Sequence, residues 1–268
     1  MGKSTFRTTE ISNPIFEKDG LRFITVKSKY LKGRGDICVF VPEGNFTDLP
    51  IVTLLHGVYG SAWVWAMLGA AHLTAANLIA EKKIKPMVIA MPSDGLWGDG
   101  SAYNAHDGYD FEKWIAEDVL RAVREMISQT SERSPLFISG LSMGGFGALR
   151  IGAKYAAQYS GISGHSSITN IQQMPLFVEE ALAHYHQSET INEDALTAII
   201  ANRNMLPPLR FDCGKSDLLI KYNRQLHIDL EAVGIVHTYQ EFKGAHTWEY
   251  WQEHLVDTLL FFDALIKE

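Results

Sequence analysis

Short apolar runs alternate with stretches of helical periodicity along most of this chain. Such runs, bounded by turn signals, are typical of parallel strands that are buried on both faces of a sheet. The pattern predicts strands over residues 21–28, 36–41, 51–55, 87–90, 135–139, 161–164, 209–214 and 236–242. The first two strands predict an amino-terminal hairpin, and the others alternate with helices. We therefore expect an α/β fold with a mostly parallel central sheet and helices on both faces.

Helical periodicity predicts the segments that cover this sheet. One helix is expected over residues 68–83, and a second carries an apolar stripe over residues 115–126. A long carboxy-terminal helix begins near Trp248 and should pack on the sheet. Residues 165–208 have no strand signal and end in two prolines, which predicts a small inserted cap. The whole chain, residues 1–268, is expected to form a single domain.

Composition narrows the possible partners. The 268 residues are 46% hydrophobic and 21% charged, and a net charge of -7 with a pI near 5.8 disfavours nucleic acid and anionic membranes. No apolar run is long enough to span a bilayer, and the amino terminus lacks the apolar core of a signal peptide, so a cytoplasmic location is expected. Cys38 and Cys213 stand far apart and are expected to be reduced. A homo-oligomer is compatible with this composition.

The most informative motif is Gly140-Leu141-Ser142-Met143-Gly144, which lies between an apolar strand and a helical stretch. A serine on a sharp strand-to-helix turn has strained backbone angles, and its neighbours are glycines because other chain segments pass close to it. This is the layout of a nucleophile elbow, so Ser142 is the candidate nucleophile. A serine hydroxyl also needs a base to remove its proton and a third group to orient that base.

The candidate acid and base follow two later strands. Reactive groups of an open α/β sheet gather beyond the carboxyl ends of the strands, and in this architecture they follow the chain order serine, acid, histidine. Asp217 follows the strand at 209–214, and His246 follows the strand at 236–242. We therefore predict Asp217 as the acid and His246 as the base. Asp212 is the alternative acid, although it stands before its strand ends.

Acyl transfer also needs hydrogen-bond donors for the oxyanion that develops in the transition state. The backbone N–H of Met143 is the first candidate, because the free N–H groups at a helix start favour negative charge. The second is the N–H of Val58, in the loop after the strand at 51–55, with Tyr59 as the alternative. His56 is expected to hold this loop through hydrogen bonds to the backbone.

The other histidines are better explained as packing or surface residues. They stand in predicted helices or in a strand, at positions 72, 227, 237 and 254. His184 and His186 form an H-x-H pair, but no third ligand stands at a useful spacing. The sequence therefore predicts no metal site.

Aromatic residues near the strand ends are candidates for the walls of a substrate pocket. Tyr59, Trp97 and Trp248 are the predicted substrate-binding residues, and Tyr103 has a similar position. Core packing explains such residues equally well. Selectivity between substrates is expected from the cap segment 165–208, because loops can vary without disturbing the reacting groups.

Together these motifs resemble the putative-esterase family of α/β-hydrolases. That family includes esterase D-like S-formylglutathione hydrolases, tributyrin-type esterases, feruloyl and acetylxylan esterases, and mycolyltransferases. The matching motifs are Leu54-Leu55-His56-Gly57, the elbow with Gly145, Cys213-Gly214 with Asp217, and Gly244 with His246 and Trp248. The resemblance implies an α/β-hydrolase fold, hydrolysis of carboxylic esters or thioesters, and no cofactor. It also implies an oxyanion donor directly after His-Gly, which is Val58 here.

The sequence thus predicts a serine esterase that acts on a small-molecule ester through an acyl-enzyme. Ser142 attacks the carbonyl carbon, His246 accepts and returns the proton, and Asp217 orients His246. An acyltransferase would have the same motifs and stays an alternative, as does a thioester hydrolase acting on S-formylglutathione. A non-catalytic binding protein is expected to have lost at least one of the three residues, and all three are present.

Overall fold

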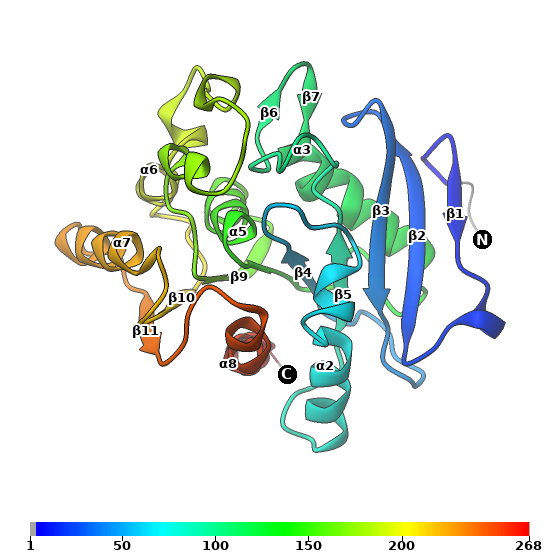
Figure 1. The fold of residues 1–268 in the computed structure, drawn as a ribbon. Helices are drawn as coiled ribbons and strands as arrows, with labels where there is room; N and C mark the ends of the chain where they lie inside the picture. Colours follow the sequence, from blue (N-terminus) through cyan, green and yellow to red (C-terminus); the bar gives the residue numbers. More distant parts are fainter. Residues whose placement is uncertain (1–3, 268) are drawn as a thin grey trace.

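A nine-stranded sheet runs through the centre of the molecule in the computed structural model, which describes residues 4–267 (Figure 1). Its strands are β1 (Thr9–Ile11), β2 (Leu21–Ser28), β3 (Gly33–Phe40), β4 (Ile51–Leu55), β5 (Val88–Pro92), β8 (Leu136–Gly140), β9 (Tyr159–His165), β10 (Leu209–Gly214) and β11 (Thr238–Phe242). Their order is β1-β2-β3-β5-β4-β8-β9-β10-β11. The pairings from β1 to β5 are antiparallel, and those from β5 to β11 are parallel. The prediction of a mostly parallel sheet is confirmed.

Helices cover both faces of this sheet. They are α1 (Val64–Met67), α2 (Ala71–Ala80), α3 (Phe111–Lys113), the π-helical η2 (Trp114–Val119), α4 (Leu120–Met126), α5 (Met143–Lys154), α6 (Ala195–Ala201), α7 (Ile220–Ala232) and α8 (Trp248–Leu265). Alternate residues of a strand point to opposite faces. In β4, Val52 and Leu54 pack in one core with α2 and α8, whereas Ile51 and Leu55 pack in a second core with α4 and α5. Strands β4, β5, β8 and β10 are therefore buried along their whole length.

Two helices differ from the sequence-based prediction. The helix expected over residues 68–83 is shorter in the structure, where α2 begins at Ala71 after an interruption at Ala70, which has a φ of 49°, and ends at Ala80. The short helix α1 lies before the expected range. Next to Ala70, a Cβ on Gly69 would lie 2.9 Å from the ring of Trp248, so the interruption coincides with the close approach of α8. The helix expected over residues 115–126 begins with the π-helical η2. The sequence did not predict this π-helix, because the spacing of apolar residues does not separate a π-turn from an α-turn.

Three short strands were not predicted. They are β1 and the two strands of a small separate hairpin, β6 (Ala105–His106) and β7 (Tyr109–Asp110). Strands of two or three residues have too few positions to show a period-two pattern. Residues 1–3 and 268, the ends of the expected domain, lie outside the described residues.

The segment between β9 and β10 contains the predicted cap. It carries the 3-10 helices η3 (Ile171–Leu176), η4 (Leu182–His184) and η5 (Thr190–Asn192), followed by α6. An isolated bridge joins Asn170 to Asp194. Met174 and Tyr185 are buried in the same core as α5, so the segment is packed on the helix that follows Ser142. Figure 1 shows it in yellow-green, on the side of the molecule that also carries β6 and β7.

None of the helices within residues 4–267 is both long enough and apolar enough to cross a membrane. Cys38 and Cys213 are buried free thiols. Burial raises the pKa of Cys38 to about 12, so this thiol stays protonated and unreactive at neutral pH.

A buried polar network joins β9, β10 and α8. The Asp212 carboxylate lies 3.0 Å from His165 Nδ1 and 3.0 Å from Arg210 Nη2, and it accepts a hydrogen bond of 2.8 Å from the Tyr250 hydroxyl. Thr258 Oγ1 lies 2.9 Å from His165 Nε2. Burial alone would raise the pKa of Asp212, but His165, with Arg210 and Tyr250, outweighs it and holds this pKa below its ordinary value.

The variant Asp212→Asn should therefore destabilise the fold at neutral pH, by about 3 kcal/mol, because it leaves a buried cation without its partner charge. Folding lowers the pKa of Asp212, so its contribution is complete above the unfolded pKa of about 4 and is lost as the pH falls through the folded pKa. Urea unfolding should show the largest gap between wild type and variant at neutral pH and a smaller gap in acid. A gap that is independent of pH would contradict this account. The exposed Asp107→Asn is the control and should change stability by less than about 0.5 kcal/mol.

Candidate active site

Ser142 stands on the turn between β8 and α5, with φ 54° and ψ -120°. A positive φ is rare for a residue with a side chain and marks strain at the elbow. The turn is held from both sides, because the Ser142 N–H donates to His165 O at 2.9 Å and the Ser142 carbonyl accepts from Phe146 N at 3.1 Å. Only 2% of Ser142 is exposed.

The glycines of the elbow are required by close packing of the backbone. A Cβ on Gly144 would lie 2.2 Å from Leu55 O, and a Cβ on Gly140 would lie 2.3 Å from Gly144 O. Real Cβ atoms do not approach backbone atoms this closely. Helix α5 can begin at this distance from β4 only because residue 144 has no side chain.

The structure brings the three predicted residues together. His246 Nε2 lies 2.9 Å from Ser142 Oγ, and His246 Nδ1 lies 2.9 Å from Asp217 Oδ2 and 3.1 Å from Asp217 Oδ1. The Asp217 side chain is fully buried, while 15% of the His246 side chain is exposed. This geometry fits a neutral imidazole that donates from Nδ1 to Asp217 and accepts at Nε2 from the Ser142 hydroxyl.

The loops that carry the acid and the base are joined to each other. The Ser216 N–H donates to Gly244 O, and the Lys215 N–H donates to Phe242 O, both at 2.8 Å. A Cβ on Gly214 would lie 2.6 Å from Gly244 O, so a side chain there would separate the two loops. This direct contact fixes the position of His246 relative to Asp217.

Two aromatic rings hold the His246 ring. The ring of Phe177, from the cap, stacks on it with a centroid distance of 5.2 Å and an angle of 28°. The ring of Trp251, from α8, meets it edge-on at 4.9 Å. Phe177 was not among the predicted site residues, since no motif surrounds it. Trp251 belongs to the carboxy-terminal helix, which was expected only to pack on the sheet.

Of the two predicted oxyanion donors, Met143 belongs to the elbow itself and Val58 to a neighbouring loop. A Cβ on Gly57 would lie 3.4 Å from Ser142 Cβ, so the loop of Val58 passes beside Ser142. Among the backbone hydrogen bonds of residues 4–267 that lie outside regular helices and strands, none uses the N–H of Val58 or of Met143. The N–H of Tyr59, the alternative donor, is already bonded to Asp99 O at 2.7 Å.

His56 bonds to the backbone through both ring nitrogens. Nδ1 lies 2.6 Å from Gly57 O, and Nε2 accepts from the Asp94 N–H at 3.0 Å. The ring is therefore neutral with its proton on Nδ1. It also fills the space beside Gly60, where a Cβ would lie 2.3 Å from Nδ1. His56 thus holds the loop, as its sequence position suggests.

The predicted substrate-binding aromatics have three different surroundings. Tyr59 is 67% exposed, and its hydroxyl donates to Phe177 O, next to the triad. Trp97 packs on His106, with a centroid distance of 4.1 Å, and on Tyr185. Trp248 packs edge-on against Trp65 at 5.7 Å and Trp251 at 5.3 Å. Of the three, Tyr59 has the direct contact with the residue that covers His246.

The alternative candidates lie apart from this site. Asp212, the alternative acid, is bound within the buried network of His165 and Tyr250 and has no hydrogen bond to His246.

The two histidines of the H-x-H pair have different partners. His186 pairs with Glu193 at 3.2 Å, and His184 lies beside Trp97. Within the described part of the chain, no group of three or more His, Cys, Asp or Glu residues could hold a metal ion.

Comparison with known proteins identifies the family of this chain. The family model described as "Putative esterase" matches residues 28–262, so the chain belongs to this esterase family. The chain is 27% identical over 262 residues to an acetyl esterase of Caldicellulosiruptor saccharolyticus, covering 87% of this chain and 94% of that protein. The predictions of the family and of an esterase are confirmed.

Solved structures show the same fold. A ferulic acid esterase superposes with a TM-score of 0.79 at 22% identity, covering 98% of this chain and 100% of that chain. An S-formylglutathione hydrolase from Agrobacterium tumefaciens superposes with a TM-score of 0.78 at 17% identity, covering 98% and 99%. The chain thus has the predicted α/β-hydrolase fold. At these identities the likeness extends to the fold and not to the substrate.

Because residue 144 touches the backbone of β4, Gly144→Ala should destabilise the protein by about 3 kcal/mol or more. Gly234→Ala is the matched control, since φ is +69° there but, among residues 4–267, no atom beyond its two chain neighbours lies within 4 Å of the added Cβ. It should cost only about 1 to 2 kcal/mol of backbone strain. Thermal and urea unfolding of both variants measure the difference. Equal losses would show that the close approach of α5 to β4 is not the constraint.

Proposed function

We propose that Ser142, His246 and Asp217 are the catalytic triad of this esterase. The observation that carries the proposal is the continuous hydrogen-bonded chain from Ser142 Oγ through His246 to Asp217, with 2.9 Å at each step. His246 takes the hydroxyl proton as Ser142 attacks the ester carbonyl, and it gives the proton to the alcohol that leaves. Water then attacks the acyl-enzyme by the same route, and Asp217 stabilises the charged form of His246 in both steps.

The N–H groups of Val58 and Met143 form the proposed oxyanion hole. Met143 is the first residue of α5, where the helix dipole favours negative charge. Val58 comes from the loop that passes beside Ser142. Two preorganised donors stabilise the charge that develops on the carbonyl oxygen in the transition state.

The proposed substrate is a carboxylic ester with a short acyl group, such as acetyl. The likeness to an acetyl esterase over 94% of that protein supports this substrate. The cap supports it as well, because Phe177 covers the His246 ring and Ser142 is only 2% exposed. Rates on p-nitrophenyl acetate, butyrate and octanoate, beside acetylated sugars, feruloyl esters and S-formylglutathione, test the proposal. A preference for S-formylglutathione would favour the thioester hydrolase instead.

Ser142→Ala should lower kcat by at least about 10,000-fold, and His246→Ala should come within about tenfold of it, because the two residues act as a unit. Asp217→Asn should have a smaller effect. A fluorophosphonate should label the wild type and not Ser142→Ala. The control Ser139→Ala, which removes a buried hydroxyl that has no hydrogen-bond partner in residues 4–267, should keep both activity and labelling. If Asp212→Asn lowers kcat more than Asp217→Asn does, the proposed acid is wrong.

Phe177 should limit the length of the acyl group. Phe177→Ala removes the ring beside His246, so kcat/KM for the octanoate relative to the acetate should rise by at least about tenfold. Phe177→Leu keeps most of the apolar volume and should change this ratio much less. An unchanged ratio in a folded, active Phe177→Ala enzyme would move the control of specificity to the loops of Tyr59 and Trp97.

A further inference from the structure

The peptide group between Gly57 and Val58 is held in one orientation. In a trans peptide the C=O and the N–H point in opposite directions, so a bond that fixes one also fixes the other. His56 Nδ1 bonds to Gly57 O at 2.6 Å, which sets the direction of the Val58 N–H. On the other side of Val58, the Tyr59 N–H is bonded to Asp99 O at 2.7 Å. Both bonds must persist for Val58 to act as an oxyanion donor.

Tyr103 holds His56 in turn. Its side chain is fully buried, and its hydroxyl donates to His56 O at 3.0 Å. The Tyr103 ring also meets the His56 ring edge-on, with a centroid distance of 6.1 Å. Burial, helped by the charge of Asp94, raises the pKa of Tyr103 well above its ordinary value, so the hydroxyl keeps the proton that it donates.

A second path of hydrogen bonds links the same two residues. His56 Nε2 accepts from the Asp94 N–H, and Asp94 Oδ2 accepts from the Ser101 N–H at 2.7 Å. Ser101 Oγ in turn accepts from the Tyr103 N–H at 3.2 Å. Tyr103, His56, Asp94 and Ser101 therefore form a closed ring of hydrogen bonds beneath the loop of Val58.

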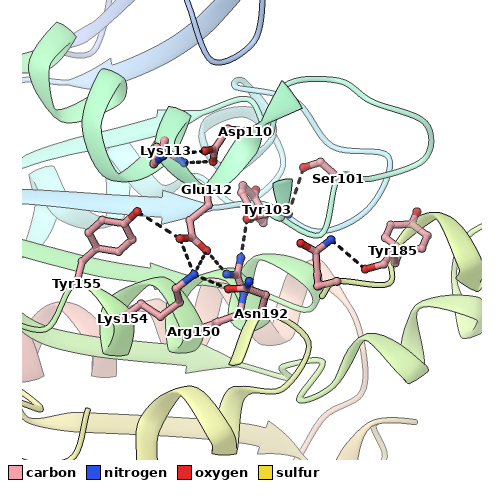
Figure 2. Close-up of polar contacts among 11 residues, drawn as sticks. Ser101, Tyr103, Asp110, Glu112, Lys113, Arg150, Lys154, Tyr155, Tyr185 and Asn192 are labelled. Atoms are coloured by element: carbon pink, nitrogen blue, oxygen red, sulfur yellow. Dashed lines mark hydrogen bonds and ion pairs between the residues drawn. The ribbon is translucent and has the colours of Figure 1, made fainter. Parts of the chain in front are cut away.

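The turn that carries Tyr103 is strained and is stabilised from the nucleophile's helix. Ala102 and Tyr103 have φ values of 51° and 54°, each of which costs about 1 to 2 kcal/mol. Arg150, a fully buried residue of α5, donates from Nη2 to Tyr103 O at 2.5 Å (Figure 2). Its guanidinium also pairs with Glu112, which Lys154 Nζ contacts at 2.7 Å. The ion pairs thus fix Arg150 where it can hold the strained turn.

We propose that Tyr103, held by Arg150, is a positioning residue that directs the Val58 N–H toward the oxyanion. Contacts with the oxyanion side of the elbow agree with this role. A Cβ on Gly100, three residues before Tyr103, would lie 2.5 Å from Met143 Sδ and 3.2 Å from Val58 Cγ1, so this turn touches both donor residues. The inference rests on the proposed function, because it assumes that the Val58 N–H acts at Ser142.

Tyr103→Phe tests the inference because it removes one hydroxyl and keeps the buried ring. A donor that acts only in the transition state changes kcat and leaves substrate binding unchanged. We expect kcat on p-nitrophenyl acetate to fall about 10- to 100-fold, with KM within about threefold of wild type. Phenylboronic acid forms a tetrahedral adduct with the serine hydroxyl, so its inhibition constant should rise in parallel.

The matched control is Tyr159→Phe, which removes a buried tyrosine hydroxyl that has no hydrogen-bond partner in the described part of the chain. It should keep kcat, KM and boronate affinity. The inference is overturned if Tyr103→Phe keeps kcat within about twofold, or if kcat falls while boronate affinity is unchanged. Ser142→Ala distinguishes a failure of the proposed triad from a failure of the positioning role of Tyr103. If Ser142→Ala is inactive and Tyr103→Phe is not impaired, the triad stands and the positioning role of Tyr103 fails.

Discussion

Helix α5 begins so close to strand β4 that residue 144 has no room for a side chain, since a Cβ there would lie 2.2 Å from Leu55 O. The chain must therefore turn sharply after β8, and Ser142 takes a φ of 54° as a consequence. Strain of this kind costs about 1 to 3 kcal/mol and persists because the surrounding core determines the position of α5. The result is a hydroxyl at the carboxyl edge of the sheet, 2.9 Å from His246 Nε2.

Two buried networks of charged residues hold the loops around this elbow. On one side, His165 pairs with Asp212, while the carbonyl of His165 accepts the Ser142 N–H. On the other side, Arg150 pairs with Glu112 and holds the turn of Tyr103. Buried ion pairs add little net stability by comparison with apolar packing, but an unpaired buried charge is costly. Arrangements that break these pairs are therefore disfavoured, and the loops keep one geometry.

The sequence predicted the parts of the site that depend on local pattern. Apolar runs and the elbow motif placed Ser142, Asp217 and His246 at strand ends, and the structure shows them within hydrogen-bond distance of one another. The αL residue Ala70 and the stacking of Phe177 on His246 depend on contacts between distant segments, which no local period encodes. Aromatic character alone could not separate a pocket wall from a packed ring. For this reason Tyr59, Trp97 and Trp248 were grouped together although their surroundings differ.

In the proposed mechanism, ester hydrolysis passes through a covalent acyl group on the strained Ser142. Mass spectrometry of the enzyme, quenched in acid during turnover of p-nitrophenyl acetate, tests this claim most directly. The account predicts that the protein gains the mass of one acetyl group, that peptide mapping places the group on Ser142, and that a burst of p-nitrophenol of matching size accompanies it. An acetyl group on another residue that forms and decays at the rate of turnover would contradict the account.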